Sequence, residues 1–193
     1  MLRGEREADA QDHRFGIAVI SVLAMMPTSV AAASCAPATV VGTSGDNKHL
    51  EGTPGDDVID ALEGVDLVDA FGGNDRVCLG PGGTSSPFEG EIARGGGDDD
   101  RLFGGPGRNY LSPGPGNDTA NGDAGQDYLV GSDGEDRMLG GGGNDDVFGG
   151  RGNDVVRGGP GVDRVNGGQG TDACFGTRSD RFIDCETING VPA

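Results

Sequence analysis

Residues 140–166 read as three consecutive nonapeptides, GGGGNDDVF, GGRGNDVVR and GGPGVDRVN. In each of them the fourth residue is glycine, the sixth is aspartate and the eighth is apolar. The same frame runs without a gap over residues 95–175, and three further units precede it at residues 52–78. Across these 12 units, position four is Gly in 11, position six is Asp in 11 and position eight is apolar in all 12. Three columns that keep a nine-residue register predict a repetitive solenoid.

The composition of the 193-residue chain agrees with such a fold. It has 40 glycines, and its 32 Asp or Glu residues against 14 Lys or Arg residues give a formal net charge of −18. Apolar residues other than glycine make up only 34% of the chain, so a thick apolar core is excluded. Strong acidity disfavours nucleic acid and anionic membranes as partners and favours cations. The register of the columns argues against a disordered acidic chain.

The consensus G-G-x-G-x-D-x-U-x resembles the repeats-in-toxin (RTX, hemolysin-type) family of calcium-binding nonapeptide repeats. This resemblance implies an all-β fold, a right-handed parallel β-roll (β-solenoid) in which two nonapeptides make one coil. It also implies turns that bind Ca²⁺ between successive coils and eighth side chains that point inward. The residue types support this fold independently, because glycine permits backbone angles with φ > 0. Stacked strands lie about 4.8 Å apart, which is about twice a calcium–oxygen distance.

The sixth-position aspartates are the candidate calcium ligands. Because stacked partners are two units apart, they fall into two rows. The first row contains Asp57, Asp75, Asp100, Asp118, Asp136, Asp154 and Asp172, and the second contains Asp66, a gap, Asn109, Asp127, Asp145 and Asp163. Aspartate also favours turns, but Asn or Gly would serve there equally well, so the near-invariant charge favours ligation. Adjacent aspartates predict about eight Ca²⁺ ions, with the weakest point in the second row near Asn109.

The sequence predicts four segments. Residues 1–33 are expected to be a signal peptide, because the apolar run at 15–26 is too short to span a membrane and small residues for cleavage follow it. Residues 34–51 are expected to form an N-terminal cap, 52–175 the calcium-binding roll with a degenerate insertion at 79–94, and 176–193 a C-terminal cap. Export to the extracellular space follows from this interpretation. A weak lipobox-like motif at Cys35 leaves a lipoprotein as an alternative.

The four cysteines, Cys35, Cys78, Cys174 and Cys185, all lie outside the predicted signal peptide. An even number in an exported chain predicts two disulfides, and four cysteines allow three connectivities. Their positions near the ends of the repeat favour Cys35–Cys78 and Cys174–Cys185, each joining a cap to the roll. Such bonds stabilise by about 2–4 kcal/mol each.

The sequence contains no H-E-x-x-H, no G-x-S-x-G and no Cys/His pair, so we expect no enzymatic activity. His49 is interpreted as a solvated cap residue. A thin core and repelling aspartates indicate that folding is coupled to calcium binding. The predicted function is therefore a secreted, non-catalytic binding or structural module whose macromolecular partner is unknown. Two alternatives remain, an orphan accessory domain of a secreted hydrolase acting in trans, and a calcium-dependent adhesin or matrix protein.

Overall fold

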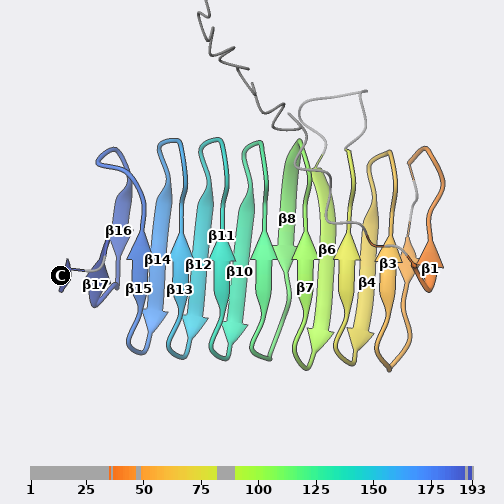
Figure 1. Ribbon diagram of the computed structural model, residues 1–193, viewed down its shortest axis with the longest axis horizontal. Helices are drawn as coiled ribbons and strands as arrows, with labels where there is room; N and C mark the ends of the chain where they lie inside the picture. Colours follow the sequence, from red (N-terminus) through yellow and green to blue (C-terminus); the bar gives the residue numbers. More distant parts are fainter. Residues whose placement is uncertain (1–34, 36, 47–48, 82–89, 190, 193) are drawn as a thin grey trace, which may run out of the picture.

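The computed structural model describes residues 35, 37–46, 49–81, 90–189 and 191–192. The predicted signal peptide at 1–33 and residues 82–89 of the insertion lie outside these ranges. The described chain is a parallel β-solenoid of two facing sheets, whose strands run in opposite directions and are joined by two rows of turns (Figure 1). Among the described residues there is no helix long and apolar enough to cross a membrane.

Odd-numbered strands form a ten-stranded sheet together with the last strand. They are β1 (Val40–Val41), β3 (Val58–Asp60), β5 (Arg76–Cys78), β7 (Arg101–Phe103), β9 (Thr119–Asn121), β11 (Arg137–Leu139), β13 (Val155–Arg157), β15 (Ala173–Phe175), β17 (Thr187–Ile188) and β18 (Val191–Pro192). The remaining strands form an eight-stranded sheet. They are β2 (Leu50–Glu51), β4 (Leu67–Gly72), β6 (Gly90–Gly97), β8 (Arg108–Ser112), β10 (Tyr128–Asp133), β12 (Asp146–Arg151), β14 (Arg164–Gln169) and β16 (Arg181–Ile183).

The strand register confirms the two-unit coil that the nonapeptide period predicts. Val147 of β12 pairs with Leu129 of β10 on one side and with Val165 of β14 on the other. Across the insertion, Val68 of β4 pairs with Ala93 of β6. The end of the segment at 79–94 therefore contributes to one strand of the eight-stranded sheet, β6, which lies between β4 and β8. The extra residues of the segment do not change the register of the coils on either side.

The core is a single column of side chains on the inner face of each sheet. All 12 eighth-position residues are at most 1% exposed, Ala93 joins the column of the eight-stranded sheet, and Ala61, Ala70 and Leu79 are buried beside the columns. Alternation along each strand explains this, because every second residue faces the other sheet. In the longer strands of the eight-stranded sheet, the second inward position holds a small residue such as Ala70 or Gly131. The core is thus one side chain thick per sheet, as the sequence predicts.

Glycine is required in the turns because successive coils approach each other closely. At Gly143 the backbone has φ +143°, and a Cβ atom there would overlap the carbonyl group of Gly125 in the preceding coil. At Gly142, by contrast, a Cβ atom would meet nothing within 4 Å. The turn thus needs glycine at position four for both its backbone angle and its packing.

Both predicted disulfides are present, Cys35–Cys78 and Cys174–Cys185, with Cα–Cα distances of 6.0 and 5.9 Å. Strands β1 and β2 extend the two sheets at one end, and β16 and β17 extend them at the other. Phe182 packs against the core from β16. The final strand, β18, pairs antiparallel with β17 and ends the ten-stranded sheet.

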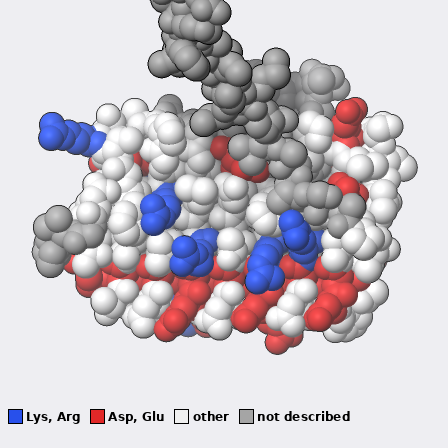
Figure 2. Space-filling model, viewed as in Figure 1, with Lys and Arg blue, Asp and Glu red and all other residues white. Residues whose placement is uncertain are grey.

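The outer surface distributes its charges unevenly. Figure 2 shows acidic side chains gathered in a band along one row of turns, with basic side chains on the face of the sheet beside it. Tyr110 and Tyr128 point outward from neighbouring strands of the eight-stranded sheet and stack with ring centroids 5.3 Å apart. Phe148 continues this aromatic column on β12, at 5.3 Å from Tyr128.

Candidate functional site

The candidate ligands lie in the two rows of turns. We call the turns that lead into the ten-stranded sheet the first row (bottom in Figure 1), and those that lead into the eight-stranded sheet the second row. Every predicted aspartate and Asn109 is at most 5% exposed. The structure brings together the residues that the sequence assigned to each row, with Asp57, Asp75, Asp100, Asp118, Asp136, Asp154 and Asp172 in the first and Asp66, Asn109, Asp127, Asp145 and Asp163 in the second.

A hydrogen-bond ladder fixes these carboxylates. In the first row, the backbone N–H of Asp118 donates to Oδ1 of Asp136 at 2.8 Å, and the N–H of Asp136 donates to Oδ1 of Asp154 at 2.8 Å. In the second row, the N–H groups of Asp127 and Asp145 donate to the next aspartate in the same way, at 2.9 Å. From Asp75 onward in the first row and from Asp127 onward in the second, one carboxylate oxygen of each aspartate is thus held by the preceding coil.

The other carboxylate oxygen, Oδ2, is buried and accepts no hydrogen bond in most of these aspartates. These are Asp75, Asp100, Asp118, Asp127, Asp136, Asp145, Asp154, Asp163 and Asp172. Burial raises the pKa of Asp127 and Asp136 to about 7, with nearby carboxylates adding to the effect, although a backbone N–H donor opposes it. A buried, ionised oxygen without a partner is unfavourable. The rows therefore present negative charge that needs a cation.

The glycine at position one keeps space open beside each carboxylate. A Cβ atom on Gly122 would come within 2.5 Å of Asp127 Oδ2 and within 2.5 Å of the Gly140 carbonyl oxygen in the next coil. Carboxylate and backbone carbonyl oxygens are the ligands that Ca²⁺ takes, at 2.3–2.6 Å and in sets of six to eight. In the described part of the chain, no three His, Cys, Asp or Glu side chains converge on one point. A cation here would thus take its other oxygens from the backbone.

Asn109 shows what the site looks like without the second carboxylate oxygen. Its Nδ2 donates to the carbonyl oxygens of Gly105 at 3.1 Å and Gly122 at 3.3 Å. Gly122 follows Asn109 by 13 residues, as Gly140 follows Asp127 in the next coil. The amide nitrogen of Asn109 therefore lies at the position that the unpartnered Oδ2 of Asp127 has in the next coil. The amide satisfies backbone oxygens that in the aspartate coils face a carboxylate.

The gap that we expected in the second row is filled by Glu91. This residue pairs with Asn109 across β6 and β8 and is 2% exposed. The insertion hid it, because the seven extra residues break the nine-residue frame. Counting back one coil from Asn109 would have found it. Burial, reinforced by the negative charge of Asp66, raises the pKa of Glu91 to about 9.

The ends of the rows are closed by residues that the repeat pattern does not contain. Asp57 is bound by Thr53 and Thr39, and despite burial these hydrogen bonds hold the pKa of its carboxyl below the usual value. At the other end, the N–H of Asp163 donates to Asp180 at 3.1 Å and that of Asp172 to Glu186 at 2.6 Å. Asp180 and Glu186 were missed because they lie off the nine-residue period.

His49 is exposed, as expected for a solvated cap residue, and it also makes specific contacts. Its Nε2 lies 2.6 Å from Asp69 Oδ2, and its Nδ1 lies 3.4 Å from Glu51 Oε1. Asp69 also pairs with Arg94 at 3.0 Å, and its pKa is lowered because these partners outweigh its burial. The group joins the N-terminal coils through exposed ion pairs and includes no Ser or Cys nucleophile.

A family model for the RTX calcium-binding nonapeptide repeat matches the chain in four copies, at residues 51–83, 90–120, 112–147 and 139–174. These segments cover more than half of the chain and coincide with the coils described above. No curated protein and no solved structure shows significant similarity to the chain. The fold, the two rows of buried carboxylates and the matching repeats together place this chain in the RTX calcium-binding nonapeptide repeat family.

Proposed function

We propose that this chain is an exported, non-catalytic module whose folding is coupled to the binding of about eight Ca²⁺ ions. The observation that carries the proposal is the set of buried Oδ2 atoms that accept no hydrogen bond, repeated coil after coil in both rows. The ligands would be the aspartates at position six, from Asp57 to Asp172 in the first row and from Asp66 to Asp163 in the second. Each ion would lie between stacked turns and be completed by backbone carbonyl oxygens.

The electrostatics give calcium a large effect on folding. In the metal-free fold, the rows stack carboxylates whose charged forms are opposed by burial and by one another. A cation that binds only the folded chain stabilises it by about 2.7 kcal/mol per site when its free concentration is 100 times the Kd. Several such sites exceed the stability of a typical domain, about 5–15 kcal/mol. Folding is therefore expected only where calcium is abundant.

Export is supported by the chemistry of the cysteines. The two disulfides close the ends of the solenoid, and such bonds persist in oxidising compartments. Extracellular calcium is roughly millimolar, which suits extracellular calcium-binding modules. The segments at 1–33 as signal peptide, 34–51 and 176–193 as caps and 52–175 as the roll form part of this proposal.

Circular dichroism of residues 34–193 across a calcium titration tests the proposal, with magnesium as the control ion. We expect little strand signal in chelator, cooperative folding with Ca²⁺, and a much weaker response to Mg²⁺. Magnesium prefers shorter bonds and retains its waters, so it fits the space between coils poorly. Equal structure with either ion, or full structure in chelator at neutral pH, would overturn the proposal.

A further inference from the structure

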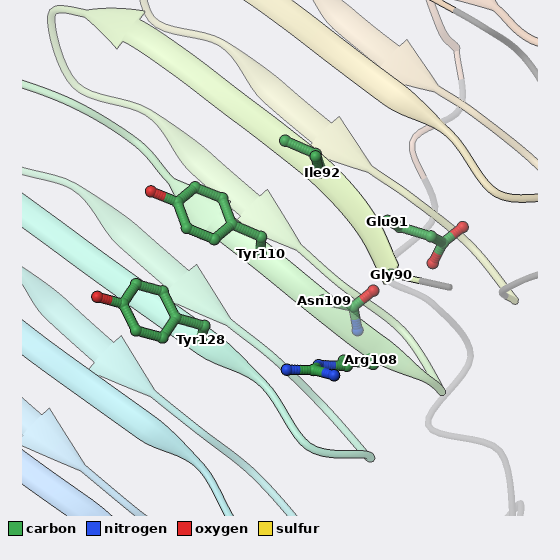
Figure 3. A pocket seen from close by; sticks show the side chains of 7 residues that line it. All are labelled: Gly90, Glu91, Ile92, Arg108, Asn109, Tyr110 and Tyr128. Carbon is green, nitrogen blue, oxygen red and sulfur yellow. The ribbon is translucent and has the colours of Figure 1, made fainter. Parts of the chain in front are cut away.

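A cavity of about 430 Å³ lies at the start of β6 and β8, beside the insertion (Figure 3). Glu91 and Asn109 line it from neighbouring coils, together with Tyr110 and Tyr128. These are the two second-row positions at which the aspartate consensus fails. The cavity therefore marks the point where the repeat provides no pair of aspartates.

Three buried oxygen atoms at this point accept no hydrogen bond. They are Oε1 and Oε2 of Glu91 and Oδ1 of Asn109. Both side chains are 2% exposed, so these oxygen atoms lie beneath the surface of the cavity and water does not solvate them. Figure 3 shows the amide oxygen of Asn109 on the side that faces Glu91 and its nitrogen on the opposite side. The nitrogen is already bound to Gly105 and Gly122, which fixes the orientation of the amide.

The charges around the cavity favour a cation. Asp66 is close enough to Glu91 for its negative charge to act on that carboxyl. Among the described residues that line this cavity, the only positive side chain is Arg108, and it is exposed and points away from Glu91 in Figure 3. A carboxylate that offers both oxygens and an amide carbonyl oxygen are hard ligands of the kind that Ca²⁺ prefers.

We propose that Glu91 and Asn109 form an additional Ca²⁺ site outside the aspartate repeat, with Glu91 binding through both carboxylate oxygens and Asn109 through its amide oxygen. The site rests on the proposed calcium-binding function. It makes the second row continuous from Asp66 to Asp163 across the insertion. Its amide ligand carries no charge, so we expect it to bind Ca²⁺ more weakly than a pair of stacked aspartates.

The test compares Glu91→Gln with Glu63→Gln in the calcium-loaded protein. Gln keeps the size of the side chain but removes the charge and one oxygen ligand, and Glu63 is an exposed turn residue that undergoes the same chemical change. Ion counting by equilibrium dialysis is expected to give one Ca²⁺ fewer for Glu91→Gln and the wild-type number for Glu63→Gln. Asn109→Ala removes the amide oxygen separately and is also expected to lose that ion.

Terbium luminescence locates the loss. The chain has two tyrosines and no tryptophan, and both tyrosines line this cavity, so tyrosine-sensitised emission reports mainly on Tb³⁺ bound nearby. We expect Glu91→Gln to lose part of this emission and Glu63→Gln to retain it. If Glu91→Gln binds as many ions as the wild type with unchanged emission, the additional site is wrong while the aspartate sites stand. If the wild type itself binds no calcium, the proposed function fails as well.

Discussion

Replacing Asp127 by Asn is expected to change stability in opposite directions with and without calcium. Asn109, one coil earlier, shows the geometry that the new side chain would adopt, with Nδ2 donating to two carbonyl oxygens. Oδ1 of the new side chain would still accept the N–H of Asn109, as Oδ1 of Asp127 does at 2.8 Å. The substitution thus preserves the ladder and replaces one unpartnered, charged oxygen by a hydrogen-bond donor.

The size of the effect in the metal-free protein follows from two contributions. Two neutral hydrogen bonds contribute about 1–3 kcal/mol together. Burial raises the pKa of Asp127 from 3.8 to about 7. Each pKa unit corresponds to about 1.4 kcal/mol, so keeping this carboxylate charged in the folded chain at neutral pH costs on the order of 4 kcal/mol of folding free energy. The contributions overlap, so we expect Asp127→Asn to stabilise the metal-free fold by about 2–4 kcal/mol. In saturating calcium the variant loses a charged ligand and is expected to be less stable than the wild type.

Two titrations measure this reversal by circular dichroism. In chelator, an osmolyte such as trimethylamine N-oxide promotes folding, and Asp127→Asn is expected to fold at a lower osmolyte concentration than the wild type. In saturating calcium, urea is expected to unfold Asp127→Asn at a lower concentration. Glu63→Gln, which removes an exposed charge, is expected to show no such reversal. If Asp127→Asn is less stable than the wild type in both titrations, the carboxylate contributes to the metal-free fold and the reasoning is refuted.

Three further predictions concern the whole repeat, its turns and its cap. Buried aspartates with pKa values raised to about 6–7 make the metal-free fold bind more protons than the unfolded chain. The stability of the metal-free fold is therefore greatest below about pH 4 and is lost as the pH rises through about 6–7. Circular dichroism in chelator is expected to show more strand at acidic than at neutral pH, and the opposite trend would contradict these pKa shifts. The new methyl group of Gly143→Ala would overlap Gly125, so this variant is expected to lower strongly the urea midpoint measured in calcium. The methyl group of Gly142→Ala meets no atom within 4 Å, so this variant is expected to leave the midpoint nearly unchanged. Equal effects would show that the close approach of the coils does not determine stability at position four. Replacing Cys174 and Cys185 by Ser is expected to cost about 2–4 kcal/mol in urea unfolding with calcium present, and an unchanged midpoint would mean that the C-terminal cap is held by packing alone.

The regular part of the fold could be predicted from the sequence because each column reflects one physical requirement. The eighth position is the only inward side chain of a three-residue strand, so an apolar column there fixes which residues form the core. The two-unit coil follows from the same period and correctly assigned Val147 and Val165 to one sheet. The disulfides followed because each cysteine pair brackets one end of the repeat.

The residues that the sequence did not reveal lie where the repeat is interrupted or ends. Glu91 was missed because the segment at 79–94 was counted as a gap, although Glu91 lies 18 residues before Asn109 and in register with it. Asp180 and Glu186 accept backbone N–H groups of the last coils without sharing the repeat spacing. The double role of Asn109 as a donor to two carbonyl groups also required coordinates. The nine-residue pattern therefore identified the two rows of buried aspartates but not the residues that complete or interrupt the rows.

A single geometric requirement connects calcium, protons and Asn109. Where a coil carries aspartate, a buried carboxylate oxygen and a backbone carbonyl oxygen of the next coil face the same small space, as Asp127 and Gly140 do beside Gly122. Two acceptors that face each other repel, so the fold is stable only when something electropositive lies between them. At Asn109 this is an amide N–H group, at low pH it is a proton on the carboxylate, and at neutral pH outside the cell it would be Ca²⁺. The amide and the proton are each limited to one coil or one pH range, whereas a divalent ion can join both coils at once. Because the chain uses Asn at one such position and Asp at nearly all others, we expect its stability to depend on the free calcium concentration.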